Sequence, residues 1–266
     1  MFSPRTLRVL PPVVAVGALV VLAQCGVEDT TGRRRIGFDV VARAARTEAD
    51  TSLGWHVTFD RARAVIGPVR WYEGPPLFGA RFLRRLQGFG VAYAHPGHYV
   101  PGEALADITA RRVVDFMAQG GMYLGRADGV SGDARSAHLE LRPPDATLGP
   151  SGAALAGATV MLRGVATRAD TTVRFEAAMV VDTNLEGLPA RATLDGSVGR
   201  WTLAADLPGW VDRVDFATLP VPATPGEMVT FPTTGQAANG LYRGVTTGSS
   251  WRFTWQPGLT GDASAQ

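Results

Sequence analysis

The sequence predicts an all-β protein, an antiparallel β-sandwich or barrel-like domain with at most one or two short helices. From Ile36 onward, short segments alternate apolar and polar residues, as half-buried strands do. The 32 glycines and 18 prolines of the chain separate these segments with turn signals. The long helices that connect parallel strands are not indicated. The pattern therefore favours many short strands joined by turns.

The first strand signal is clear at residues 55–59, where Trp55, Val57 and Phe59 share one face. A second strand, residues 64–73, is interrupted at Gly67-Pro68, a position where an edge or bulge tolerates proline. Further along the chain, the patterns predict a short amphipathic helix at 80–87 and strands at 89–94, 111–117, within 119–132 and at 136–142.

The second half has stronger β signals. Residues 159–166 and 171–181 flank a turn and predict a hairpin. Asp195-Gly196 is a second turn signal, between strands at 191–194 and 199–204. The rest of this half predicts a short helix or irregular edge at 210–216, loops over 220–250 and a last strand at 251–255.

The N-terminus has the features of a targeting segment. Arg5 and Arg8 precede an apolar run, residues 9–23, that is short for a transmembrane helix. The run ends in Leu22-Ala23-Gln24-Cys25, which resembles the lipobox of bacterial lipoproteins. The resemblance implies that Cys25, the only cysteine, is lipidated with acyl chains such as palmitate and becomes the first residue of the mature chain. The alternative is an ordinary cleaved signal peptide.

These signals predict the domain organisation and location. We expect a lipoprotein signal peptide at 1–24, a tether at 25–37, one β-domain at 38–256 with a lobe boundary near 143–152, and a disordered tail at 257–266. Because Gly26 and Val27 follow Cys25 in place of aspartate, the lipoprotein resemblance implies the outer membrane of a Gram-negative cell envelope.

The charge of the mature chain is balanced. Residues 1–24 contain two arginines and no acidic residue, so their removal leaves 24 basic and 24 acidic side chains. This balance argues against nucleic acid as a partner. The expected partners are the membrane, through the lipid on Cys25, and a protein of the envelope.

A candidate metal site centres on His95-Pro96-Gly97-His98. Pro-Gly is a tight-turn signal, and the outer residues of such a turn lie within about 7 Å, so two imidazoles can converge on one ion. The two remaining histidines, His56 and His138, lie on the polar faces of predicted strands and would complete the ligand set if those strands were neighbours. An all-histidine site suits a copper or zinc ion, with Tyr99, Glu103 and Glu140 as surrounding partners.

Three interpretations of function follow. The first is an envelope lipoprotein that binds copper or zinc through the turn. The second is a non-catalytic structural or interaction lipoprotein that binds a protein or glycan, with His95 and His98 in an ordinary turn. The third, a metal hydrolase or oxidase, needs an open coordination position and a general base such as Glu103 or Glu140. Catalysis is the least favoured, because neither carboxylate stands in a recognised metalloenzyme spacing. The sequence also contains no nucleophile elbow, phosphate-binding loop or dinucleotide fingerprint.

Overall fold

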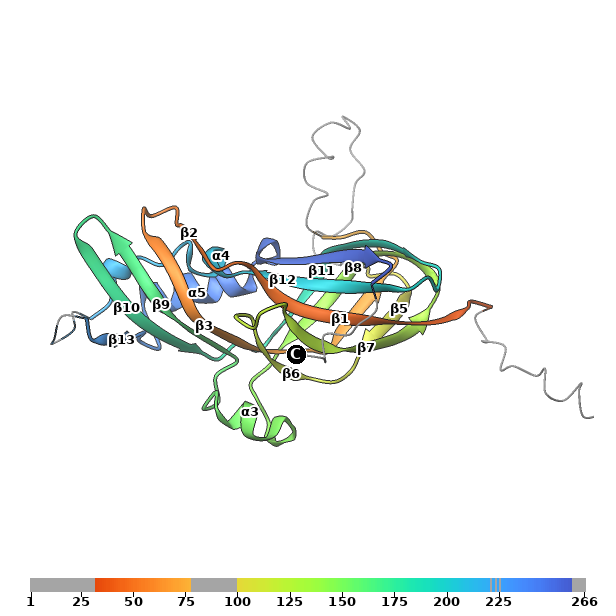
Figure 1. The fold of residues 1–266 in the computed structure, drawn as a ribbon, viewed down its shortest axis with the longest axis horizontal. Helices are drawn as coiled ribbons and strands as arrows, with labels where there is room; N and C mark the ends of the chain where they lie inside the picture. The colour runs from red at the N-terminus through yellow and green to blue at the C-terminus, as the bar shows by residue number, and fades with distance from the viewer. Residues whose placement is uncertain (1–31, 78–99, 221, 223, 225, 260–266) are drawn as a thin grey trace, which may run out of the picture. The chain divides into compact units, whose positions relative to one another are not determined.

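Two β-sheets make up the chain from Arg35 onward (Figure 1). The computed structural model describes residues 32–77, 100–220, 222, 224 and 226–259. These residues contain fourteen strands and three short α-helices, which confirms the all-β class predicted from the sequence. None of the described helices is both long and apolar enough to cross a bilayer.

The larger sheet has eight strands and nearly closes into a barrel. Its strands are β1 (Arg35–Arg46), β4 (Val69–Tyr72), β5 (Ala104–Ile108), β7 (Met122–Val130), β8 (Gly132–Leu141), β11 (Thr183–Leu194), β12 (Gly199–Asp206) and β14 (Trp251–Pro257). Their order is β11-β8-β4-β5-β7-β1-β12-β14, and the edge strands β11 and β14 contact each other. Only β1 and β12 are parallel; the other neighbours in this sheet are antiparallel.

Aromatic side chains fill the interior of the barrel. Trp71 packs edge-on against Phe38, with ring centroids 5.2 Å apart, and lies 6.1 Å from Trp201. Phe253 contacts both tryptophans at 5.8 and 6.3 Å. These four side chains come from four strands and are buried. An eight-stranded barrel is just wide enough for side chains to fill it, so the interior here is a packed core.

The smaller sheet has six strands: β2 (Glu48–Asp50), β3 (His56–Ile66), β6 (Arg112–Asp115), β9 (Val160–Arg168), β10 (Thr171–Met179) and β13 (Met228–Thr230). Five of them follow the order β13-β10-β9-β3-β2, and β6 pairs with β3. The predicted hairpin is confirmed, since β9 and β10 pair antiparallel from Arg168 opposite Thr171. The short β13 runs parallel to β10.

The chain passes between the two sheets several times, and two of these connections fall at positions that the sequence singles out. β3 and β4 are joined at Gly67-Pro68, the predicted interruption, and belong to different sheets. The segment from β8 to β9 also changes sheet and contains the 3-10 turn η1 (Ala146–Leu148) and helix α3 (Gly149–Ala153). Strands do flank Asp195-Gly196, but β11 and β12 pair with other neighbours instead of with each other.

The prediction of loops over 220–250 is wrong. That range contains β13, helix α5 (Gln236–Thr246) and the 3-10 turn η3 (Gly248–Ser250). α5 packs against α4 (Leu207–Val211), which together with η2 (Phe216–Thr218) accounts for the predicted short helix near 210–216. A Cβ on Gly240 would lie 2.7 Å from the backbone oxygen of Arg213, so glycine permits this close approach. The glycine content that weakens the helix signal in the sequence therefore also allows α5 to approach the neighbouring backbone closely.

Some predicted segments lie outside the described residues: the helix at 80–87, the strand at 89–94 and the signal peptide at 1–24. At the N-terminal boundary, β1 begins at Arg35, inside the range assigned to the tether. At the C-terminal boundary, β14 extends to Pro257, the first residue of the predicted tail.

Candidate functional site

The two strand histidines of the predicted metal site lie in different sheets. His56 begins β3, where its Nδ1 atom lies 2.9 Å from Oδ1 of Asp50 on the neighbouring β2. His138 lies in β8, opposite Arg70 of β4. The predicted meeting of His56 and His138 across neighbouring strands is therefore not formed. The chain changes sheet at Gly67-Pro68, and the alternation of apolar and polar residues does not indicate which sheet a strand joins.

The other predicted ligands, His95 and His98, lie outside the described residues, as do Tyr99 and Cys25. Within the described part of the chain, no group of three or more His, Cys, Asp or Glu side chains is arranged to hold a metal ion.

His138 lies against an aromatic ring on the neighbouring strand. Its imidazole and the Tyr72 ring are 4.3 Å apart between centroids, tilted by 41°. Burial lowers the pKa of His138 below its ordinary value, against the opposite effect of the nearby Glu186 carboxylate. Burial also raises the pKa of the Tyr72 hydroxyl. The His138 ring is therefore neutral at neutral pH, which is the form that binds metals.

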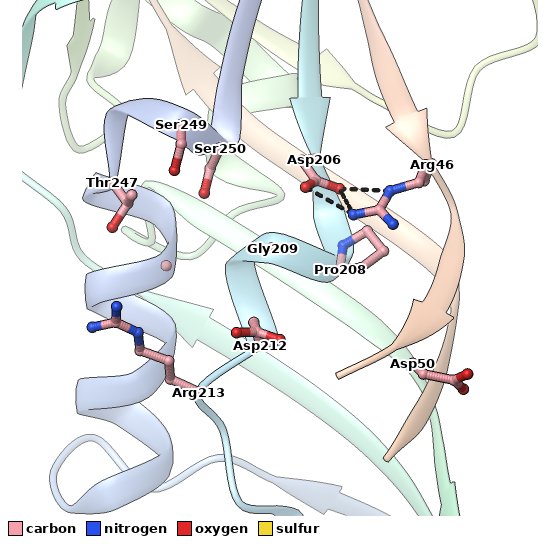
Figure 2. Close-up of a pocket in the computed structure, with 11 residues that line it drawn as sticks. Arg46, Asp50, Asp206, Pro208, Gly209, Asp212, Arg213, Thr247, Ser249 and Ser250 are labelled. Carbon is pink, nitrogen blue, oxygen red and sulfur yellow. Dashed lines mark hydrogen bonds and ion pairs between the residues drawn. The ribbon is translucent and has the colours of Figure 1, made fainter. Parts of the chain in front are cut away.

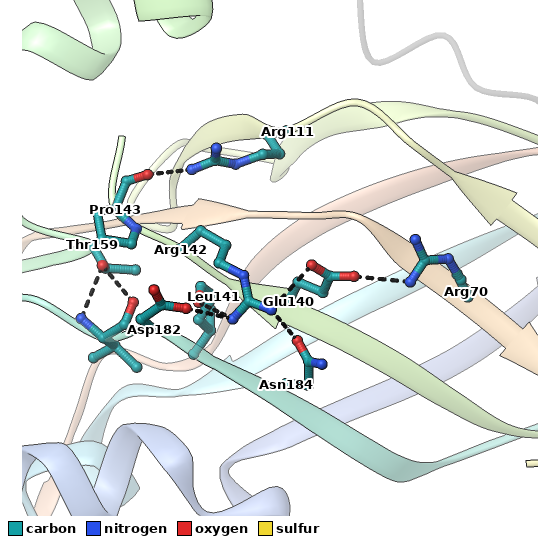
Figure 3. A network of polar contacts seen from close by, with 10 residues as sticks. Arg70, Arg111, Glu140, Leu141, Arg142, Pro143, Thr159, Asp182 and Asn184 are labelled. Atoms are coloured by element: carbon teal, nitrogen blue, oxygen red, sulfur yellow. Dashed lines mark hydrogen bonds and ion pairs between the residues drawn. The ribbon is translucent and has the colours of Figure 1, made fainter. Parts of the chain in front are cut away.

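Glu140, a predicted partner of the metal site, is the centre of an ion-pair network (Figure 3). Its Oε1 atom lies 2.8 Å from Nη1 of Arg70, and its Oε2 atom lies 3.4 Å from Nη2 of Arg142. Arg142 also donates to Asp182 at 2.7 Å and to Asn184 at 2.5 Å. The network joins β4, β8 and β11, so both carboxylate oxygens of Glu140 contact arginines that tie these strands together.

Backbone hydrogen bonds near Glu103 join the two chain segments that flank residues 78–99. The Glu73 amide donates to the Glu103 oxygen at 3.1 Å, and the Gly74 amide donates to the Pro101 oxygen at 2.7 Å. The Leu77 amide donates to the Gly187 oxygen at 2.9 Å. These bonds hold Pro101 against Gly74 and Leu77 against β11.

A polar cleft of about 260 Å³ lies where β1, β12, α4 and α5 meet (Figure 2). Arg46 and Asp206, on the parallel strands β1 and β12, form a two-pronged ion pair with Nη2 to Oδ1 and Oδ2 distances of 2.8 and 2.9 Å. Asp212 accepts the Ser52 amide at 2.7 Å. A neighbouring cavity of about 280 Å³ shares the Arg46–Asp206 pair and adds Arg252.

The cleft is shaped by a glycine and two serines. A Cβ on Gly209 would lie 2.9 Å from Oδ2 of Asp206 and 3.4 Å from Oγ of Ser250, so glycine keeps that space open. Figure 2 shows the hydroxyls of Ser249 and Ser250 pointing toward α4. The lining contains arginine, aspartate, serine and threonine but no histidine or cysteine. This donor set suits the binding of a small polar molecule and lacks a nucleophile with an adjacent imidazole base.

Sequence reasoning did not identify the cleft. Arg46 and Asp206 are 160 residues apart and share no local motif. The one local signal is the hydroxyl-rich run of residues 246–250, Thr-Thr-Gly-Ser-Ser, which lies in the range predicted as loops. Comparisons of the chain with protein-family models, with curated proteins and with solved structures find no match.

Proposed function

We propose that this chain is an envelope lipoprotein, anchored through Cys25, that binds a copper or zinc ion through His95 and His98. The observation that carries the proposal is the sequence His95-Pro96-Gly97-His98, whose Pro-Gly pair predicts a tight turn that would bring two imidazoles together in a chain with four histidines. The site is a binding site; its role is to hold or hand over the ion outside the cytoplasm.

His138 is the third ligand in this proposal, and His56 is not part of the site. Val100 is five residues beyond His95, and five residues of extended chain span about 17 Å. Pro101 is hydrogen-bonded to Gly74, two residues beyond Tyr72, and Tyr72 lies against His138. The His95 imidazole is thus within chain reach of His138. The lowered pKa of His138 supports its use as a ligand, because protons compete less with a metal ion for the imidazole nitrogen at neutral pH.

Elemental analysis of the soluble domain, without the lipid anchor, tests the metal site of the proposal. Residues 27–266, made without a His tag, are dialysed against trace copper and zinc, and bound metal is measured per chain. We expect about one tightly held ion for the wild type and for the control His56→Ala, none for the double variant His95→Ala/His98→Ala, and weaker retention for His138→Ala. Stoichiometric metal on the double variant would contradict the assignment, as would a wild-type protein that stays empty with both metals.

A second candidate function, an interaction lipoprotein with a protein partner, is favoured by an apolar groove. The groove has a volume of about 280 Å³ between β10 and α5 and is lined by Met179, Val180, Phe231, Leu241 and Tyr242 among others. Val180 and Tyr242 are exposed there. This function predicts a partner from the envelope that co-purifies with the wild type and is lost with Val180→Glu, while metal binding is absent.

A further inference from the structure

One end of the barrel gathers the start of β1 and the ends of its neighbours, and we call it the Arg35 end. Three pairs of facing residues define it: Arg35 with Val130, Gly132 with Leu194, and Gly199 with Pro257. In each pair the first residue of one strand faces the last residue of its neighbour in the sheet. The strand pairs are β1 with β7, β8 with β11, and β12 with β14. Figure 1 shows β1 starting at this end of the barrel, on the right of the view.

Exposed apolar side chains concentrate at the Arg35 end. Among the described residues, seven large apolar side chains are exposed, and three of them, Val100, Val198 and Leu259, lie at or beside this end. The amide of Gly258 donates to the oxygen of Val198 at 2.8 Å, which brings Val198 and Leu259 together. Single exposed apolar residues are ordinary on a protein surface, but three of them on the turns of one barrel end indicate a contact surface.

The polar groups of this end are compatible with a lipid surface. Arg35 is exposed and carries a positive charge, which anionic headgroups attract. Two of the carboxylates here are used in local bonds: Asp133 accepts the Thr193 hydroxyl at 2.8 Å, and Asp195 accepts the Ser197 amide at 2.8 Å. The apolar side chains and Arg35 together match the interfacial region of a bilayer.

The position of the proposed anchor identifies the occupant. Ten residues separate Cys25 from Arg35, a span of at most about 35 Å, so a lipid on Cys25 tethers β1 by its first residue. We infer that the Arg35 end of the barrel rests on the membrane interface, with Val198 and Leu259 in contact with lipid. This inference relies on the lipid anchor proposed above and adds the face that meets the bilayer.

The orientation has a consequence for the cleft. β1 has twelve residues and ends at Arg46, which lines the cleft. At about 3.3 Å per residue, Arg46 lies about 36 Å from Arg35 along the strand. The cleft and the α4–α5 region therefore point away from the bilayer, where soluble molecules reach them.

A matched pair of valines tests the inference. Val198 follows β11 by four residues and is 55% exposed, whereas Val180 precedes β11 by three residues and is 61% exposed. The full chain is purified from membranes as Val198→Cys, Leu259→Cys or Val180→Cys, labelled on the new thiol with a fluorophore, and reconstituted in vesicles with and without nitroxide-headgroup lipid. We expect the labels at 198 and 259 to lose most of their fluorescence in nitroxide vesicles and the label at 180 to keep it.

The outcomes separate the inference from the anchor on which it relies. If the chain fails to float with the vesicles, the lipid anchor is wrong and the inference falls with it. If the chain floats but all three labels keep their fluorescence, or all three lose it equally, the anchor stands and the orientation is overturned. A label at 198 that is shielded from aqueous iodide but not quenched by lipid nitroxide would show a protein on this face and would also overturn the inference.

Discussion

The contact between α4 and α5 gives a sharp test of the structure through one methyl group. Gly244 lies on the face of α5 that meets α4, and Gly240, one turn earlier on the same face, meets Arg213 just beyond α4. A Cβ on Gly244 would overlap the backbone oxygen of Trp210 and lie 2.5 Å from its carbonyl carbon and 2.7 Å from its Cα atom. The perturbation is therefore Gly244→Ala, which adds the smallest side chain at the closest approach of the two helices.

Two opposing effects set the magnitude. Alanine in place of glycine favours a helix by about 1 kcal/mol where space is free. At Gly244 the new atom is 0.9 Å inside the 3.4 Å of ordinary contact with the Trp210 carbonyl carbon, and backbone cannot turn aside as a flexible side chain can. Overpacking of this kind costs about 1–3 kcal/mol, and separating the helices also loosens the buried Leu241 and Val245. We expect Gly244→Ala to lower the free energy of unfolding by about 1–2 kcal/mol.

Urea denaturation followed by tryptophan fluorescence measures the change, with Asn239→Ala as the control. Asn239 is an exposed position of the same helix, so the same residue type enters α5 without a clash, and we expect a gain of about 0.5 kcal/mol. If Gly244→Ala stabilises the protein as Asn239→Ala does, the two helices do not approach as closely as described.

Two further predictions concern the barrel. Because burial lowers the pKa of His138 in the folded protein, the unfolded chain binds the proton first as the pH falls, and the free energy of unfolding decreases below the ordinary pKa of 6.5. The wild type should therefore lose more free energy of unfolding than His138→Gln between pH 7.5 and 5.5. Equal losses would contradict the lowered pKa. Trp201→Ala should cost about 3–5 kcal/mol in urea denaturation, since the fully buried ring contacts Trp71, Phe253 and Trp255, and a cost below that of an exposed substitution would contradict a filled barrel.

Features encoded by neighbouring residues could be predicted from the sequence. The β9–β10 hairpin, the interruption at Gly67-Pro68 and the last strand at 251–255 all depend on a local pattern with a turn signal beside it. Helix α5 could not be predicted this way, because its two glycines, asparagine and threonine have low helix propensity and the helix is stabilised by burial against α4. The same limit explains why His56 and His138 were expected to meet: each strand pattern is correct, but the sheet to which it belongs depends on distant partners.

The cleft shows what kind of information the local patterns lack. Because β1 and β12 run in parallel, the chain segments that follow them stay side by side with a constant offset of 160 residues. This offset joins Arg46 to Asp206, Ser52 to Asp212, and the Trp55 indole to Asp215 at 3.3 Å. One contact motif thus repeats along two segments that share no sequence similarity, and the cleft residues are positioned by this register.

A one-residue insertion tests whether this register holds the cleft together. A glycine inserted after Thr47 moves Ser52 and Trp55 out of register with Asp212 and Asp215, so at about 1 kcal/mol for each hydrogen bond we expect a loss of about 2–3 kcal/mol in unfolding free energy. The control is a glycine inserted after Gly157, in the connection between β8 and β9, where a Cβ would meet no atom within 4 Å. Loop lengthening alone costs little, so the control should stay within about 0.5 kcal/mol of wild type. Equal effects of the two insertions would mean that the 160-residue register contributes no more to stability than an ordinary loop.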